Sequence, residues 1–153
     1  MIIVKPFKIL NWQYLQKRRF LYNEPVYFPA IVFAMLLGTY LELYFTGMGM
    51  YSFPVRPFAD VFKIHIVFNL AGLPVFTWFF LWAGIRMNKA GRGLLIVLFS
   101  MAGPVLEVLS ESLGMFWHAG EWKHWYTFIG YFIFLLIVWN VFKWTNIQED
   151  RGK

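Results

Sequence analysis

The sequence contains no cysteine and few charged residues. The absence of cysteine excludes disulfides, zinc–thiolate sites, iron–sulfur clusters and covalently attached haem c. Charged residues make up 14% of the chain, whereas an average soluble domain has about 25%. So few charges could not cover a surface that faces water, and 59% of the residues are hydrophobic. The composition therefore predicts an integral membrane protein.

The sequence also lacks the motifs of common soluble enzymes. It has no phosphate-binding loop, no dinucleotide fingerprint and no Ser-His-Asp arrangement. Its net charge of +6 is more informative about membrane topology than about nucleic acid, because basic residues set the orientation of membrane helices. We therefore predict no nucleic-acid partner and no organic cofactor, and we assign no catalytic residue.

Four apolar stretches have about the 20 residues that a membrane-spanning helix needs. They cover residues 27–46, 61–85, 93–113 and 126–144, within one predicted transmembrane bundle of residues 27–153. Residues 1–26 mix basic with aromatic and leucine side chains, which predicts an amphipathic helix on the inner membrane surface. An unstructured tail is the alternative for that segment. The predicted fold is all-α and membrane-integral.

The basic residues indicate which helix ends face the cytoplasm. Eleven of the 14 lie in the N-terminal segment, in the loop between the second and third spans, and from the end of the fourth span onward. Only Arg56, Lys63 and Lys123 lie in the other two loops or at their ends. Because Lys and Arg resist translocation, we predict a multi-pass protein of the cytoplasmic membrane with both termini in the cytoplasm.

The first and third predicted spans match at an offset of 65 residues. The match pairs Gly38 with Gly103, Leu41-Glu42 with Leu106-Glu107, and Gly49-Met50 with Gly114-Met115. The second and fourth spans match poorly, although they fall at the same offset. The pattern predicts two helical hairpins that enter the membrane in the same direction, which is a parallel repeat. Chance similarity is the alternative.

The repeat places two glutamates at equivalent positions inside the membrane. A charged acid at the bilayer centre costs about 2.5–3.5 kcal/mol, so such acids usually face a cavity or a partner. We predict an outward-facing acidic pocket that binds or transports a small cationic solute or a proton. Its candidate residues are Glu42, Arg56, His65, Glu107 and Glu111. Structural pairing of the two acids with nearby basic groups is the alternative.

A second candidate site lies in the Trp- and His-rich segment before the last span. His118, Glu121 and His124 are three residues apart, so on a helix they would share one face. Imidazole and carboxylate groups suit zinc or similar ions. The alternative is an aromatic interfacial loop with polar tips.

Two further functions remain open at this point. The protein could be a scaffold or accessory subunit of a larger membrane complex, or a homo-oligomer that builds a pathway between its copies. It could also be a membrane-embedded enzyme that acts on lipid or envelope precursors, although the sequence favours a protein without enzymatic activity. In each case the lipid bilayer is a predicted partner.

Three segments carry a resemblance to a known family. They are Gly38-Thr-Tyr-Leu-Glu42, the run Gly49-Met-Tyr-Ser-Phe-Pro-Val-Arg-Pro57, and the Trp- and His-rich segment before the last span. Together they resemble an uncharacterised family of small multi-span membrane proteins of endospore-forming Bacillota. The resemblance implies a membrane location and a size, and it implies no activity.

Overall fold

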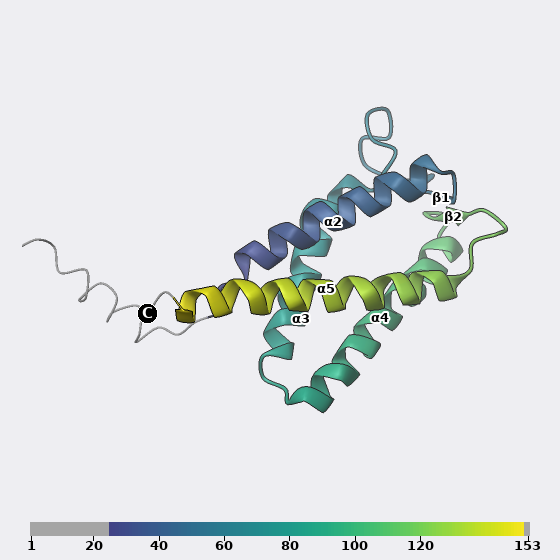
Figure 1. Ribbon diagram of the computed structural model, residues 1–153. Helices are drawn as coiled ribbons and strands as arrows, with labels where there is room; N and C mark the ends of the chain where they lie inside the picture. The colour runs from purple at the N-terminus through teal and green to yellow at the C-terminus, as the bar shows by residue number, and fades with distance from the viewer. Residues whose placement is uncertain (1–24, 152–153) are drawn as a thin grey trace, which may run out of the picture.

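The computed structural model describes residues 25–151, with side chains up to residue 146, as a set of helices and one small sheet (Figure 1). In chain order these elements are α2 (Phe28–Gly47), β1 (Tyr51–Ser52), the π-helix η1 (Phe68–Gly72), α3 (Leu73–Gly84), α4 (Lys89–Ser112), β2 (Trp117–His118) and α5 (His124–Arg151). The predicted interfacial helix in residues 1–26 lies almost wholly outside the described residues.

Three helices are long and apolar enough to cross a membrane. They are Phe28–Gly47, Lys89–Ser112 and the part of α5 from His124 to Asn146. Many large apolar side chains on their outer faces are exposed, Leu36 and Tyr40 on α2 among them. A mostly helical chain of this kind is consistent with the predicted all-α membrane protein, and the two-residue strands are a small departure from it.

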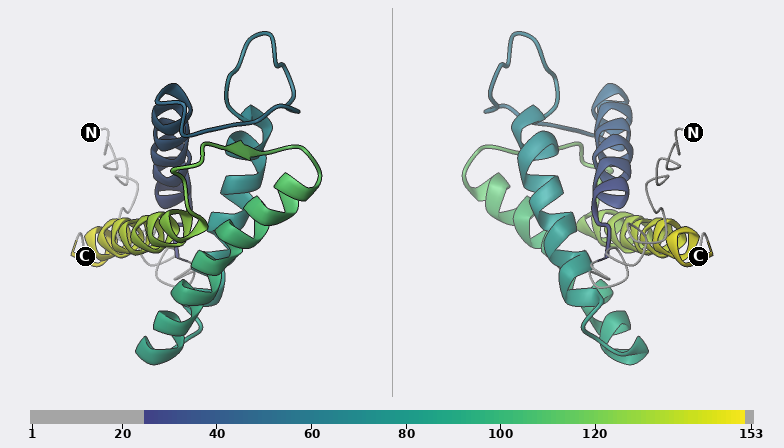
Figure 2. Two further views of the ribbon diagram at one scale, coloured as in Figure 1. Left: turned by 90° about the vertical axis from the view of Figure 1, so that its right-hand side faces the viewer. Right: turned by 90° about the vertical axis from the view of Figure 1, so that its left-hand side faces the viewer.

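The second predicted span is shorter than the sequence suggested. The apolar helix formed by η1 and α3 covers Phe68–Gly84, about 26 Å at 1.5 Å per residue, whereas the hydrocarbon core is about 30 Å thick. The predicted start at residue 61 is wrong, because residues 53–65 form a loop that projects from the helices (Figure 2). Four complete spans therefore stay a prediction.

The π-helix has a local cause in the sequence. Pro74 lacks an N–H group, and its ring crowds the carbonyl four residues earlier. The backbone accommodates the proline with a wider turn, in which the N–H of Leu73 donates to the carbonyl of Phe68, five residues back. This turn places Asn69 in the interior, where it is almost completely buried.

The hydrophobic core lies where the helices pack on α5, with α2 and α4 on different sides of it (Figure 1). Alanines of α2 and large apolar side chains of the other helices form it: Ala30, Ala34, Leu73, Phe80, Leu81, Leu95, Ile96, Phe134, Leu135, Val138, Trp139 and Phe142. Small residues on one helix let the next approach closely, as is usual between membrane helices.

Helices α2 and α4 each end in a turn of the same type. Gly49 and Gly114 have φ values of +71° and +69°, a left-handed conformation that glycine adopts without strain. The N–H groups of Met50 and Met115 then donate to carbonyls in the last helical turns, at 3.1 and 2.8 Å. The two turns lead into β1 and β2, which pair antiparallel with Tyr51 opposite His118 and Ser52 opposite Trp117.

Two glycines mark the closest approaches between helices. A Cβ at Gly38 would overlap the side chain of Leu73, and a Cβ at Gly103 would lie 2.5 Å from the ring of Tyr131. Each glycine lies one turn before a glutamate of the same helix. The close packing therefore brings a neighbouring helix within hydrogen-bonding reach of Glu42 and of Glu107.

Candidate metal centre

Four polar side chains meet at the end of the fold where β1 pairs with β2. Glu107 and Glu111 lie one turn apart on α4, His118 is the last residue of β2, and His124 is the first residue of α5. Glu111 contacts His118 directly, through its Oε1 and the Nδ1 of the histidine. Its Oε2 is 3.7 Å from the Nε2 of His124, and the Nδ1 of that histidine is 3.1 Å from the Oε2 of Glu107.

Three backbone features bring these side chains together. The helical spacing of four residues puts both glutamates on one face of α4. The Gly114 turn reverses the chain just after α4, and pairing with β1 fixes β2. The N–H of Ala119 also donates to the carbonyl of Met50, at 2.9 Å. His118 is therefore held in place by the first half of the chain, although its partners lie in the second half.

Glu107 is firmly held on its own. Its Oε1 accepts a hydrogen bond of 2.6 Å from the hydroxyl of Thr127 and a long one of 3.4 Å from the indole of Trp122. Its Oε2 faces His124, and the side chain is only 12% exposed, whereas that of His124 is 39% exposed. The cluster therefore has a buried end at Glu107 and an open end at the histidines.

The open end fits a divalent transition-metal ion. Ligand atoms of Glu111, His118 and His124 all lie within 4.8 Å of one another. Zinc bonds of about 2.0–2.2 Å place tetrahedral ligands roughly 3.4 Å apart, so small rotations of half-exposed side chains would suffice. Two imidazoles and one carboxylate suit zinc, copper or nickel better than they suit calcium or magnesium, which prefer oxygen ligands.

Glu42 lies in a separate environment. It is buried, and its carboxylate accepts hydrogen bonds from the side-chain amide of Asn69 and, at 3.0 Å, from the backbone N–H of His65. The imidazole of His65 accepts from the N–H of Phe68 at 3.2 Å. These contacts join α2 to the segment that begins the next helix, η1.

Arg56 is turned toward its own loop. Its guanidinium donates to the carbonyls of Phe53, Ala59 and Phe62, at 2.6, 3.1 and 2.5 Å. Among the contacts of the described residues there is no ion pair between Arg56 and Glu42, so Arg56 is not the basic partner of this acid. The guanidinium instead organises residues 53–62.

The aromatic side chain of Tyr51 lies near both glutamates. The ring of Tyr51 packs against Phe45, Phe53, Phe116 and Trp122, with centroid distances of 5.3–6.2 Å. Burial raises the pKa of the Tyr51 phenol, and the charges of Glu42 and Glu107 raise it further. The phenol therefore stays neutral well above the pH at which an exposed tyrosine ionises.

The predicted site residues thus fall into three places. Glu107 and Glu111 join the two histidines, Glu42 joins His65, and Arg56 stays in its loop. Glu111 occupies the place that the sequence suggested for Glu121, which is exposed in the turn before α5. Residues 118–124 do not form the single helix on which that grouping depended. No pattern in the sequence indicated that Thr127 and Trp122 donate hydrogen bonds to Glu107.

Comparison of the chain with protein-family models, with curated proteins and with solved structures finds no match. The resemblance to a family of spore-forming bacteria stays a prediction. The case for function therefore depends on the chain's own geometry.

Proposed function

We propose that this protein is a multi-pass membrane protein that binds one divalent transition-metal ion with Glu111, His118 and His124. The observation that carries the proposal is the convergence of their ligand atoms within 4.8 Å. The three side chains come from α4, β2 and α5, and each of these elements is fixed by contacts of its own. The proposal keeps the predicted cationic ligand but moves its site from the Glu42 and Glu107 pair to the second hairpin.

The contacts of Glu107 support a role in orienting His124 rather than in binding the metal ion itself. A metal-bound histidine usually donates a hydrogen bond from its second ring nitrogen to a carboxylate. This bond orients the imidazole and strengthens it as a ligand. Because the Nδ1 of His124 faces Glu107, its Nε2 is directed to the cluster, toward Glu111. Glu107 is thus a positioning residue, and Thr127 and Trp122 hold it in turn.

We place the site on the extracytoplasmic side of the cytoplasmic membrane. The basic residues of the α3–α4 connection lie at the opposite end of α4 from the cluster. There Arg86 stacks on Trp82 and Arg92 on Trp139, with the guanidinium carbons 4.0 and 4.2 Å from the ring centroids. Tryptophan and basic side chains together are typical of a cytoplasmic membrane interface. Both termini are then cytoplasmic.

We also propose that the two halves arose by duplication. Gly38 packs on Leu73 as Gly103 packs on Tyr131, and Glu42 meets Asn69 as Glu107 meets Thr127. The residues matched between α2 and α4 are 65 apart, whereas those matched on the following helices are 58 apart. A connecting segment seven residues longer in the first half explains why the second and fourth spans match poorly at one offset.

The duplication supports a stoichiometry of one ion per chain. At the offset of 65, Thr46 stands where the second half has Glu111, and Phe53 stands where it has His118. Neither threonine nor phenylalanine replaces those ligands for zinc. The first half therefore keeps its buried glutamate for packing, and the second half alone carries the ligand set.

Metal binding by the purified protein tests the proposal. The protein is stripped with a chelator in detergent, and zinc binding is measured by calorimetry together with elemental analysis. We expect one zinc per chain, and loss of that ion in Glu111→Gln and His124→Gln. Glu121→Gln is the matched control, since its carboxylate lies on the adjacent turn outside the cluster.

Two results would overturn the metal site. One is zinc binding in Glu111→Gln and His124→Gln that equals that of the unmodified chain. The other is an equal loss in Glu121→Gln. Thermal unfolding followed by tryptophan fluorescence, recorded on every variant, separates loss of a ligand from loss of the fold.

A further inference from the structure

We propose that the loop of residues 53–62 lies within the outer leaflet of the bilayer. A lipid acyl chain there fills the hollow between this loop and the start of the helix that contains η1. The inference uses the membrane location proposed above and is independent of the metal site. It assigns to this loop an interaction surface whose partner is the lipid itself.

The loop exposes several large apolar side chains, beside one exposed charge at Asp60. Val55, Phe58 and Val61 are 59%, 67% and 73% exposed, whereas the charged Arg56 is half-buried. Loops in water normally expose polar groups and bury apolar ones, because exposed apolar area is costly. Side chains arranged in this way suit an apolar surrounding.

Part of the loop backbone is hydrogen-bonded within the loop. Arg56 donates to three of its carbonyls, and the carbonyl of Phe58 accepts from the N–H groups of Val61 and Phe62, both at 2.9 Å. Pro54 and Pro57 have no N–H to satisfy. Irregular backbone is excluded from lipid mainly because unpaired polar groups are costly there. The three carbonyls that accept from Arg56 avoid that cost.

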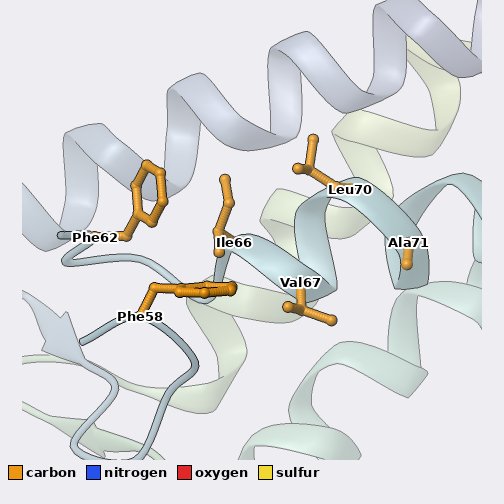
Figure 3. Close-up of a pocket in the computed structure, with 6 residues that line it drawn as sticks. All are labelled: Phe58, Phe62, Ile66, Val67, Leu70 and Ala71. Atoms are coloured by element: carbon orange, nitrogen blue, oxygen red, sulfur yellow. The ribbon is translucent and has the colours of Figure 1, made fainter. Parts of the chain in front are cut away.

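The hollow beside the loop has only carbon side chains at its wall. It has a volume of about 430 Å³ and is lined by Phe58 and Phe62 from the loop and by Ile66, Val67, Leu70 and Ala71 from the helix (Figure 3). The helix continues this apolar surface through exposed residues of α3 such as Val75. An acyl chain matches such a wall, which offers no hydrogen-bonding side chain. Exposed Asp60 and Lys63 then mark the level of the headgroups.

The absence of cysteine allows a direct test by site-directed spin labelling. Single cysteines replace Phe58 and Val61, and each labelled protein is reconstituted into phosphatidylcholine–phosphatidylglycerol vesicles. Collision of the nitroxide with oxygen, which concentrates among acyl chains, is compared with collision with chromium oxalate, which stays in water. Val75→Cys provides the lipid reference and Glu121→Cys the water reference.

We expect labels at residues 58 and 61 to resemble the label at 75, with an oxygen-to-chromium collision ratio several-fold above that at 121. Ratios at 58 and 61 that equal the ratio at 121 would overturn the inference. So would labels shielded from both reagents, which would indicate a protein partner. If residue 75 itself behaves like 121, the proposed membrane location fails as well, so the two failures are distinguishable.

Discussion

At the scale of single residues, the contact between Glu107 and His124 has the most direct chemical consequence. The carboxylate is nearly buried and held by Thr127, so it can fix which imidazole nitrogen points to the cluster. Loss of a carboxylate that orients a metal-bound histidine typically costs about 10–100-fold in metal affinity.

Glu107→Gln is therefore expected to weaken zinc binding by about that factor while keeping one ion per chain. Calorimetric titration measures both quantities. Glu42→Gln is the matched control, because it changes the equivalent carboxylate in the first half, which contacts Asn69 and the backbone of His65. Unchanged affinity in Glu107→Gln would contradict the positioning role, and complete loss of the ion would make Glu107 a direct ligand.

Tyr51 gives a second prediction, on pH. Its pKa is raised in the folded protein by burial and by the neighbouring carboxylates. Above pH of about 10 the tyrosine of the unfolded chain ionises while the folded one stays neutral, so folding loses up to about 1.4 kcal/mol per pH unit from this group. Below that pH the contribution is fully present.

Tyr51→Phe removes the ionisable group and leaves most of the aromatic packing. Unfolding temperatures from tryptophan fluorescence are compared for the two proteins at pH 8 and pH 11. The difference between them should shift in favour of the variant at the higher pH. A difference that is the same at both values would show that Tyr51 ionises normally in the folded protein.

The candidate site illustrates how far residue patterns can be read from the sequence. His118 and His124 could be singled out, because imidazoles beside a carboxylate are typical ligands of zinc. The third ligand could not, because the grouping with Glu121 assumed a helix. A strand ends at His118 and α5 begins only at His124. Glu111 is brought in by the Gly114 turn and by strand pairing across the two halves, and neither is visible in local spacing.

At the scale of elements, the crossing of α4 and α5 depends on Gly103. A methyl group there would lie 2.5 Å from the Tyr131 ring and 3.1 Å from the Cγ2 of Thr127. Overpacking of this kind typically costs about 1–3 kcal/mol. Gly93 on the same helix has open space around its Cα.

Gly103→Ala is accordingly expected to lower the unfolding temperature and to weaken zinc binding, since Thr127 supports Glu107. Gly93→Ala should be neutral or slightly stabilising, because alanine favours the helix by up to about 1 kcal/mol. The double variant Gly103→Ala with Tyr131→Leu should recover part of the loss. Equal behaviour of the two glycine variants would show that the helices do not pack closely at Gly103.

The sequence predicts elements well where the signal is a long apolar run. Three spans agree with α2, α4 and the apolar part of α5 to within a few residues, since the hydrophobic length of a span is a local property. The second span began too early because residues 61–64 are also largely apolar. Their loop conformation depends on Arg56, which reaches carbonyls three and six residues away.

At the scale of the whole molecule, orientation in the membrane decides on which side both proposed sites lie. The proposed metal site and the proposed lipid contact of residues 53–62 are on the outer side only if the α3–α4 connection is cytoplasmic. Charge distribution predicts this arrangement, and the distance along α4 between Lys89 and Glu111 puts the two features at opposite ends of one span.

Single cysteines at Lys89 and Glu121 test the orientation in intact cells. A membrane-impermeant maleimide should label Glu121→Cys directly and Lys89→Cys only after the cells are permeabilised. Both positions lie outside the core, so little effect on folding is expected. The reverse pattern of labelling would put the metal cluster on the cytoplasmic side and would contradict the predicted topology.

The pairing of β1 with β2 also bears on how the chain is made. The ribosome delivers β1 long before β2, so β1 has an unpaired strand edge until the second half of the chain is made. Every ligand of the cluster lies between Glu107 and His124, and His118 takes its place only when β2 joins β1. A truncated chain that ends after α4 would thus have neither a sheet nor a metal site, and it would present quality-control proteases with an open strand.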